Sequence, residues 1–106
     1  MPKYLVRASY TAEGARGVMS DGGSGRRDAI AKTVEGLDGR IESIYFALGE
    51  DDVIVVFDLP DNASVAAVGM AVSASGLVKT RTTALLTVEE MDEAARKSVS
   101  FRGPGQ

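Results

Sequence analysis

The sequence predicts a single α+β domain with a ferredoxin-like order of elements, strand–helix–strand–strand–helix–strand, followed by an additional C-terminal helix. Its length of 106 residues suits one domain. Runs of β-branched and aromatic residues alternate with segments of helical period, and turn or capping residues separate them. We expect the domain to occupy residues 1–100 and residues 101–106 to form a flexible tail.

Four runs rich in β-forming residues predict the strands. The second and third runs are joined by a turn at residues 49–51 and therefore predict a β-hairpin. Strict alternation along the second run places Ile44 and Phe46 on one face and Ile41 and Tyr45 on the other. The four runs are residues 4–10, 41–48, 52–59 and 77–86.

Three segments with helical spacing of apolar residues or with helix-capping signals predict helices. The second has Asp61 or Asn62 as its N-cap and Gly76 at its end. The third opens with a capping box formed by Thr87 and Glu90. The three segments are residues 28–37, 63–75 and 88–97.

Several glycines lie before and after the first of these predicted helices. Residues 12–25 contain five glycines, so they predict a short helical turn after Thr11, a possible N-cap, and then a loop. This loop is either a flap over a binding site or a plain connection. Asp38 and Gly39 end the helix, and we expect Gly39 to take the left-handed conformation.

The third strand indicates that both faces of the sheet are apolar, although the two main helices can bury only one of them. It is apolar at every position from Val53 to Phe57, so both faces of the central sheet need burial. Right-handed crossovers place both main helices on one face only. We expect a second copy of the chain to cover the other face as an isologous homodimer, or within a higher homo-oligomer. The alternative is a monomer in which residues 88–97 fold back over that face.

Composition excludes several kinds of chemistry. The chain has no cysteine and no histidine, which excludes disulfides, thiolate nucleophiles, iron–sulfur clusters and the usual haem and zinc ligands. The acidic run at residues 50–52 is typical of a solvated turn, and we expect neither a metal nor a cofactor.

Charge and hydropathy also limit the classes of binding partner that we expect. A net charge of −3 with scattered basic residues argues against nucleic-acid binding. No apolar stretch reaches the ~18 residues of a membrane span, and the N-terminus shows no signal segment. We therefore expect a cytoplasmic protein with no membrane partner.

Polar residues on the first and fourth strands predict an anion-binding site. These strands are neighbours in the split βαβ sheet. Arg7 and Ser9 share one face of the first strand, and Lys79, Arg81 and Thr83 share one face of the fourth. If these faces coincide, they form a cationic, hydroxyl-bearing site for a carboxylate or phosphate. The alternative is a solvated edge strand whose charges oppose aggregation.

Two residue types are candidates for proton transfer. Asp58 follows the buried run and is either a buried base with a raised pKa or a strand-end hydrogen-bonding residue. Tyr45 and Tyr10 are either ligand-orienting phenols or half-buried structural tyrosines.

The stretch at residues 49–61, Gly-Glu-Asp-Asp-Val-Ile-Val-Val-Phe-Asp-Leu-Pro-Asp, resembles the signature region of the GYD-domain family. Residues 11–14, 42–47, 74–76 and 85–90 resemble it too. Asp51 replaces the tyrosine of the family motif if Asp52 is its aspartate. The resemblance implies a ferredoxin-like fold of the dimeric α/β-barrel type. Proteins of that type include haem enzymes, cofactor-free monooxygenases and small-molecule binders, so the fold does not choose a function.

The leading functional hypothesis is a homo-oligomer that binds a small anionic or polar metabolite through Arg7 and Arg81. One alternative is a cofactor-independent enzyme of the dimeric α/β-barrel type that uses Asp58 or a tyrosine. Another is a structural or regulatory oligomer without a ligand.

Overall fold

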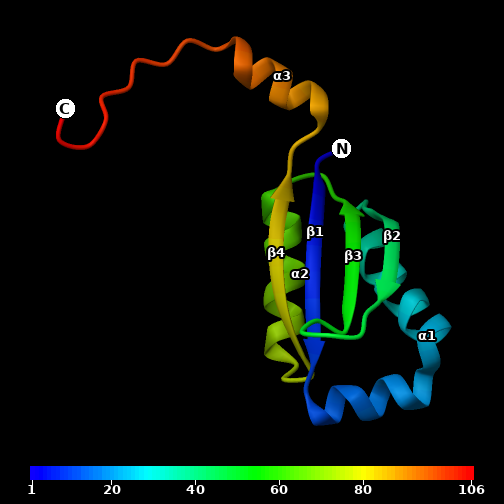
Figure 1. Ribbon diagram of the computed structural model, residues 1–106. Coiled ribbons are helices and arrows are strands. Elements are labelled where there is room, and N and C mark those ends of the chain that lie inside the picture. The colour runs from blue at the N-terminus through cyan, green and yellow to red at the C-terminus, as the bar shows by residue number, and fades with distance from the viewer.

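The computed structural model describes residues 1–106 and contains one four-stranded antiparallel sheet with strand order β2-β3-β1-β4. This confirms the predicted α+β, ferredoxin-like arrangement with a C-terminal helix (Figure 1). The elements are β1 (Lys3–Tyr10), α1 (Ala12–Glu35), β2 (Arg40–Phe46), β3 (Val53–Asp58), α2 (Asn62–Ala74), β4 (Val78–Leu85) and α3 (Val88–Arg96).

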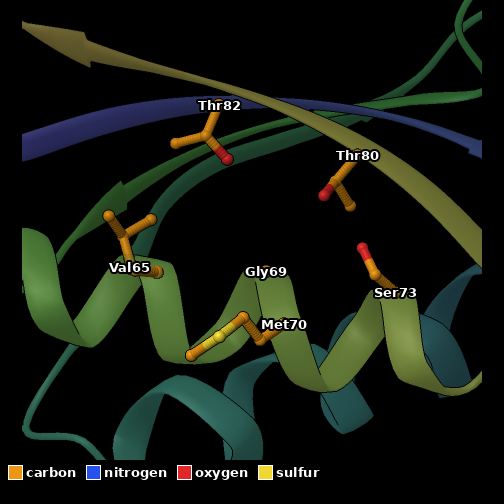
Figure 2. Close-up of a pocket in the computed structure, with 7 residues that line it drawn as sticks. Val65, Gly69, Met70, Ser73, Thr80 and Thr82 are labelled. Atoms are coloured by element: carbon orange, nitrogen blue, oxygen red, sulfur yellow. The ribbon is translucent and has the colours of Figure 1, made fainter.

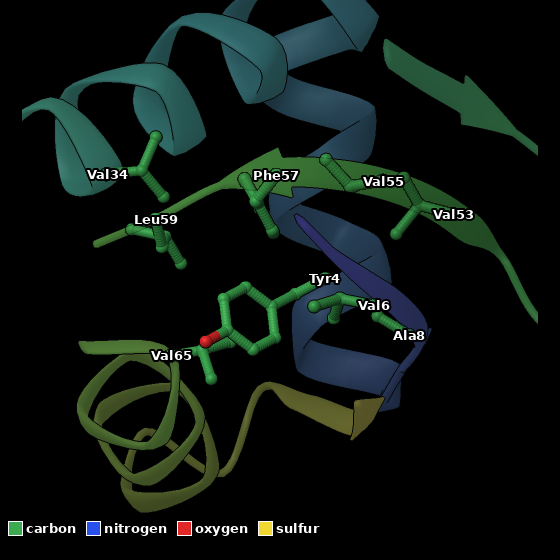
Figure 3. Close-up of a cluster of buried hydrophobic side chains, with 9 residues drawn as sticks. All are labelled: Tyr4, Val6, Ala8, Val34, Val53, Val55, Phe57, Leu59 and Val65. Carbon is green, nitrogen blue, oxygen red and sulfur yellow. The ribbon is translucent and has the colours of Figure 1, made fainter. Parts of the chain in front are cut away.

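The hydrophobic core lies between the sheet and the helices α1 and α2. Alternate residues of the two central strands face it, because side chains along a strand point to opposite sides in turn. Figure 3 shows these side chains converging with others from α1, α2 and the end of β3. The buried set is Tyr4, Val6 and Ala8 from β1, Val53, Val55 and Phe57 from β3, with Val34, Leu59 and Val65.

The segment at residues 12–25 is helical, so the predicted turn and loop were wrong there. Helix α1 runs on to Glu35 and is broken at Gly22, whose φ of 70° and ψ of 176° are not helical. Thr11 caps its start by accepting a hydrogen bond from the Gly14 backbone nitrogen. Gly14 is needed for space, because a Cβ there would collide with the carbonyl oxygen of Leu77. Only one of the five glycines therefore breaks the helix.

The turn after α1 also differs from the prediction. Asp38, with φ 60°, takes the left-handed conformation that was expected of Gly39. A Cβ at Gly39 would lie 2.8 Å from the carbonyl oxygen of Asp58 and would overlap the Leu59 side chain. Gly39 is thus required by close packing of this turn on the end of β3.

A register shift in β2 changes which of its side chains face the helices. Ile41 pairs with Phe57 and Ile44 pairs with Val55, with an irregularity between Ile41 and Ser43. Ile41 and Ile44 therefore both pack against the core, although strict alternation placed them on opposite faces. Tyr45 remains on the opposite side of the sheet.

The predicted caps of the last two helices are confirmed. Asp61 accepts a 2.8 Å hydrogen bond from the Ser64 backbone nitrogen at the start of α2. Thr87 and Glu90 form the complete capping box of α3. After α2, Gly76 has a φ of 72°, the left-handed conformation that glycine accepts readily.

Helix α3 and the following residues extend away from the domain as an arm, here defined as residues 86–106 (Figure 1). None of the residues of α3 is buried. The arm makes the molecule elongated, with extents of 56, 33 and 24 Å. In this chain α3 does not fold back over the second face of the sheet, which we call the open face.

No helix combines the length and the apolar character required to span a membrane.

Candidate functional site

The predicted anion-binding residues do share one face of the sheet. In the β1–β4 register Arg7 lies opposite Arg81, and Ser9 lies opposite Lys79. Thr83 lies opposite Leu5, so it belongs to the same face. This is the open face, on the side away from α1 and α2. The structure therefore brings the five residues together, but on a surface rather than in a hollow.

Several of these residues already have partners. Nη2 of Arg81 lies 2.8 Å from Oδ1 of Asp51, and this carboxylate raises the pKa of Arg81. Ser9 Oγ donates a 3.1 Å hydrogen bond to the carbonyl oxygen of Glu50. Like charges directly opposite on neighbouring strands destabilise a sheet. Asp51 offsets the repulsion between Arg81 and Arg7, and it is held in place by the β2–β3 turn.

Asp58 is the centre of an ion cluster at one end of the open face. Its side chain is only 3% exposed, and its two oxygens lie 2.7 Å from Lys3 Nζ and 2.6 Å from Arg40 Nε. Lys3 also lies 3.1 Å from Glu42. The hydrogen bond from Lys3 is the main cause that lowers the pKa of Asp58, and Arg40 adds to it.

The geometry therefore corrects the idea that Asp58 is a base with a raised pKa. Burial alone would raise its pKa, but two cations outweigh that effect. Asp58 instead joins the ends of β1, β2 and β3. Tyr45, the other candidate for catalysis, is 72% exposed on the same face.

The structure has several hollows, and two of them lie between the sheet and its helices. The first is an open groove of about 410 Å³ between α2 and β4. Figure 2 shows Thr80 and Thr82 of β4 facing Val65, Gly69 and Ser73 of α2 across it. A Cβ at Gly69 would meet nothing within 4 Å, so the groove is open at that point.

The second hollow is an open apolar cleft of about 320 Å³ bounded by the sheet, α1 and α2, here called the central cleft. Its lining includes strand residues that also form the core, such as Val6 and Val55. Ile30 of α1 and Val72 of α2 lie on its two walls. Fourteen of its eighteen lining residues are hydrophobic. In Figure 1, α2 lies behind β4 and β1, whereas the second half of α1 lies behind β2. The cleft lies between these two helices.

Two residues that line this cleft each carry a buried polar atom without a hydrogen-bond partner. These atoms are the phenolic oxygen of Tyr10 and Nε of Arg26. Buried polar groups are paired in about nine cases of ten or more. Arg26 has one distant acidic neighbour, since its Nη1 lies 3.9 Å from Oδ2 of Asp21. The cleft thus combines apolar walls with two residues whose buried polar atoms lack a partner.

The break in α1 accounts for the position of Arg26. Gly22 redirects the helix, and the following Gly23 packs on Phe46, since a Cβ there would lie 3.3 Å from that ring. Arg26 then follows one turn later, at the cleft. Sequence reasoning considered Tyr10 as a ligand-orienting residue but missed Arg26, because residues 12–25 were expected to form a loop. No local pattern around Arg26 indicates that it enters a cavity.

Comparison with known proteins gives one match. The family model described as the GYD domain matches residues 4–95. No curated protein and no solved structure matches the chain.

Proposed function

The chain belongs to the GYD-domain family, and we propose that it acts as a small-molecule-binding homodimer whose ligand occupies the central cleft. One observation carries this proposal: the core is not closed between α1 and α2, although side chains over a core normally pack closely and leave few voids larger than water. Its volume of about 320 Å³ falls in the range of small-molecule sites, about 300–1,000 Å³.

The volume of the cleft limits the size of the ligand. A cavity of about 150 Å³ holds benzene, so one of about 320 Å³ has room for about a dozen non-hydrogen atoms. Its lining is mainly aliphatic, with valines from β1, β3 and α2. The favoured ligand is therefore a compact organic molecule with a substantial apolar part.

This assignment moves the ligand away from the open face. Arg7 and Arg81 are exposed there, and Arg81 is engaged by Asp51. We instead assign Arg7, Lys79 and Arg81 to the rim of a dimer interface, where charged residues give orientation and specificity. The Arg7–Arg81 pair is the second candidate position for the ligand within the same function.

The homodimer is proposed because the open face has an apolar centre without cover. Leu5, Ile54 and Val56 lie there on neighbouring strands and are only partly buried. The occupant is the same face of a second copy, since a two-fold axis brings identical patches together. In such a dimer the apolar centres meet and the charged residues surround them.

The arm belongs to the same proposed interface. The sheet has four strands of up to eight residues, which at about 4.8 Å spacing and 3.3 Å rise give about 500 Å² in plan. A standard interface takes about 800 Å² from each partner. The exposed apolar side chains of Leu86, Val88 and Met91 can supply further area. A nine-residue helix is marginal in water alone, so packing on a partner would also stabilise α3.

Cleft binding can be tested by blocking the cleft. The probe is 4-phenyl-1-butanol, which has about a dozen non-hydrogen atoms, the number that the cleft accommodates. We expect it to raise the melting temperature of the wild-type protein, because binding to the native state stabilises it. Val68→Phe, which fills the central cleft, should abolish this shift. Ala66→Phe, in the open groove between α2 and β4, should leave the shift unchanged. No shift in the wild type, or a shift that survives Val68→Phe, contradicts the proposal.

A further inference from the structure

The polar groups of the central cleft are few, and two of the five already donate to backbone carbonyls. Besides Tyr10 and Arg26, the lining includes the hydroxyl groups of Thr33, Ser75 and Thr80. Thr33 donates a 3.1 Å hydrogen bond to a carbonyl one turn earlier in α1. Ser75 donates a 2.6 Å hydrogen bond to a carbonyl at the end of α2. Neither hydroxyl proton is therefore free to bind a ligand.

The two buried groups without a hydrogen-bond partner are both donors. Nε of Arg26 carries a hydrogen and no lone pair, and the phenol of Tyr10 can donate as well. The guanidinium is always charged, and its acidic neighbour Asp21 is at 3.9 Å, near the limit of an ion pair. A cation in an apolar wall whose carboxylate neighbour lies as far away as 3.9 Å favours an anion as a closer partner.

From these observations, and on the premise that the central cleft is the ligand site, we infer that the ligand is a small monocarboxylic acid with an apolar body. Its carboxylate accepts hydrogen bonds from Arg26 Nε and the Tyr10 hydroxyl, which matches two oxygens to two donors. Its apolar body lies against the core side chains of β1 and β3.

A carboxylate fits this donor set better than a phosphate does. A phosphate group offers three strong acceptor oxygens and carries a charge of about −1.5 to −2 at neutral pH. The cleft provides one cation, and two of its four hydroxyl groups already donate to backbone carbonyls. A buried phosphate would therefore keep excess negative charge beside a single cation, which is costly in an apolar cleft.

The test compares an acid with its matching alcohol, 4-phenylbutyrate against 4-phenyl-1-butanol, by calorimetric titration at neutral pH. We expect the acid to bind roughly tenfold to a hundredfold more tightly, since hydrogen bonds to charged groups are worth that much. Arg26→Met should reduce the acid's advantage to less than about threefold and leave the alcohol's affinity unchanged. Tyr10→Phe should reduce the advantage in part. Retained alcohol binding shows that each variant keeps its cleft.

Arg27→Met is the matched control, because Arg27 is the neighbouring residue, is exposed and does not line the cleft. It should bind both probes as the wild type does. Equal binding of acid and alcohol by the wild type overturns the carboxylate inference and leaves the cleft function standing. Failure of both probes overturns the proposed function itself. An acid preference that survives Arg26→Met but disappears in Arg81→Met would place the acid on the open face and overturn this inference.

Discussion

Replacing Asp58 by asparagine tests the structural role of the ion cluster on the open face. Asparagine has nearly the same shape but carries no charge, so Lys3 and Arg40 lose the carboxylate that they both contact. Hydrogen bonds to charged groups contribute about 1.5–3 kcal/mol each, and breaking a buried pair costs about 3–5 kcal/mol. Arg40 is 72% exposed and can turn to water, which reduces the loss. We expect Asp58→Asn to lower the free energy of unfolding by about 2–3 kcal/mol at neutral pH.

The pH dependence follows from the lowered pKa of Asp58. A carboxyl group with a lower pKa in the folded state stabilises the fold above its unfolded pKa, and this stabilisation is lost as pH falls through the folded value. The ordinary pKa is 3.8, and Lys3 and Arg40 lower it. The stability difference between the wild type and Asp58→Asn should therefore be constant from about pH 5 to 8 and shrink below about pH 4.

Urea unfolding at one fixed protein concentration measures this difference, with Asp28→Asn as the control. Asp28 is exposed and contacts only its neighbour Arg27, so its replacement should change stability by less than about 0.5 kcal/mol. Equal effects of the two substitutions at pH 7 would refute the reasoning. A gap that is undiminished at pH 3 would refute it too.

Three further outcomes are expected. Tyr10→Phe should leave the free energy of unfolding unchanged or raise it by up to about 1 kcal/mol, because it removes a buried hydroxyl without a partner. A loss above about 1 kcal/mol in urea unfolding would show that the hydroxyl is paired. Gly22→Ala should cost about 1–2 kcal/mol because φ is positive there, whereas Gly17→Ala in the same helix should be stabilising; the same sign for both in thermal unfolding would contradict the break in α1. Ile54→Asp places a charge at the apolar centre of the open face and should convert the dimer into a folded monomer, whereas Ala67→Asp on α2 should leave the dimer intact. Analytical ultracentrifugation measures both, and a wild-type protein that sediments as a monomer at high concentration rules out the dimer.

The order of elements could be predicted because local signals agreed with the packing. The unbroken apolar run of β3 and the period of α2 each indicated one structure. The caps at Asp61 and Thr87 marked helix starts that the structure has. The open face was predictable for the same reason, since two helices cannot cover both sides of one sheet.

The errors came from residues whose role depends on distant neighbours. Gly14 and Gly39 are glycines because Leu77 and Leu59 pass close to them, not because the chain must turn there. The irregularity after Ile41 reverses the face of that side chain, and alternation alone cannot reveal it. Sequence spacing likewise could not show that Lys3 and Arg40 meet Asp58 and lower its pKa.

The candidate site was the least predictable part. Topology and alternation placed Arg7 and Arg81 on neighbouring strands, whereas the register that sets them opposite each other comes from the structure. The central cleft could not be predicted, because its walls are set by the break at Gly22 and by the separation of α1 from α2. Apolar residues that line a cleft and apolar residues that fill a core have the same pattern in a sequence.

A crystal structure of the protein with 4-phenylbutyrate would test the central claim most directly. The account predicts one molecule between α1 and α2, with its carboxylate oxygens within about 3.2 Å of Arg26 Nε and the Tyr10 hydroxyl. A carboxylate bound between Arg7 and Arg81 on the open face, with side chains closed over the central cleft, would contradict it.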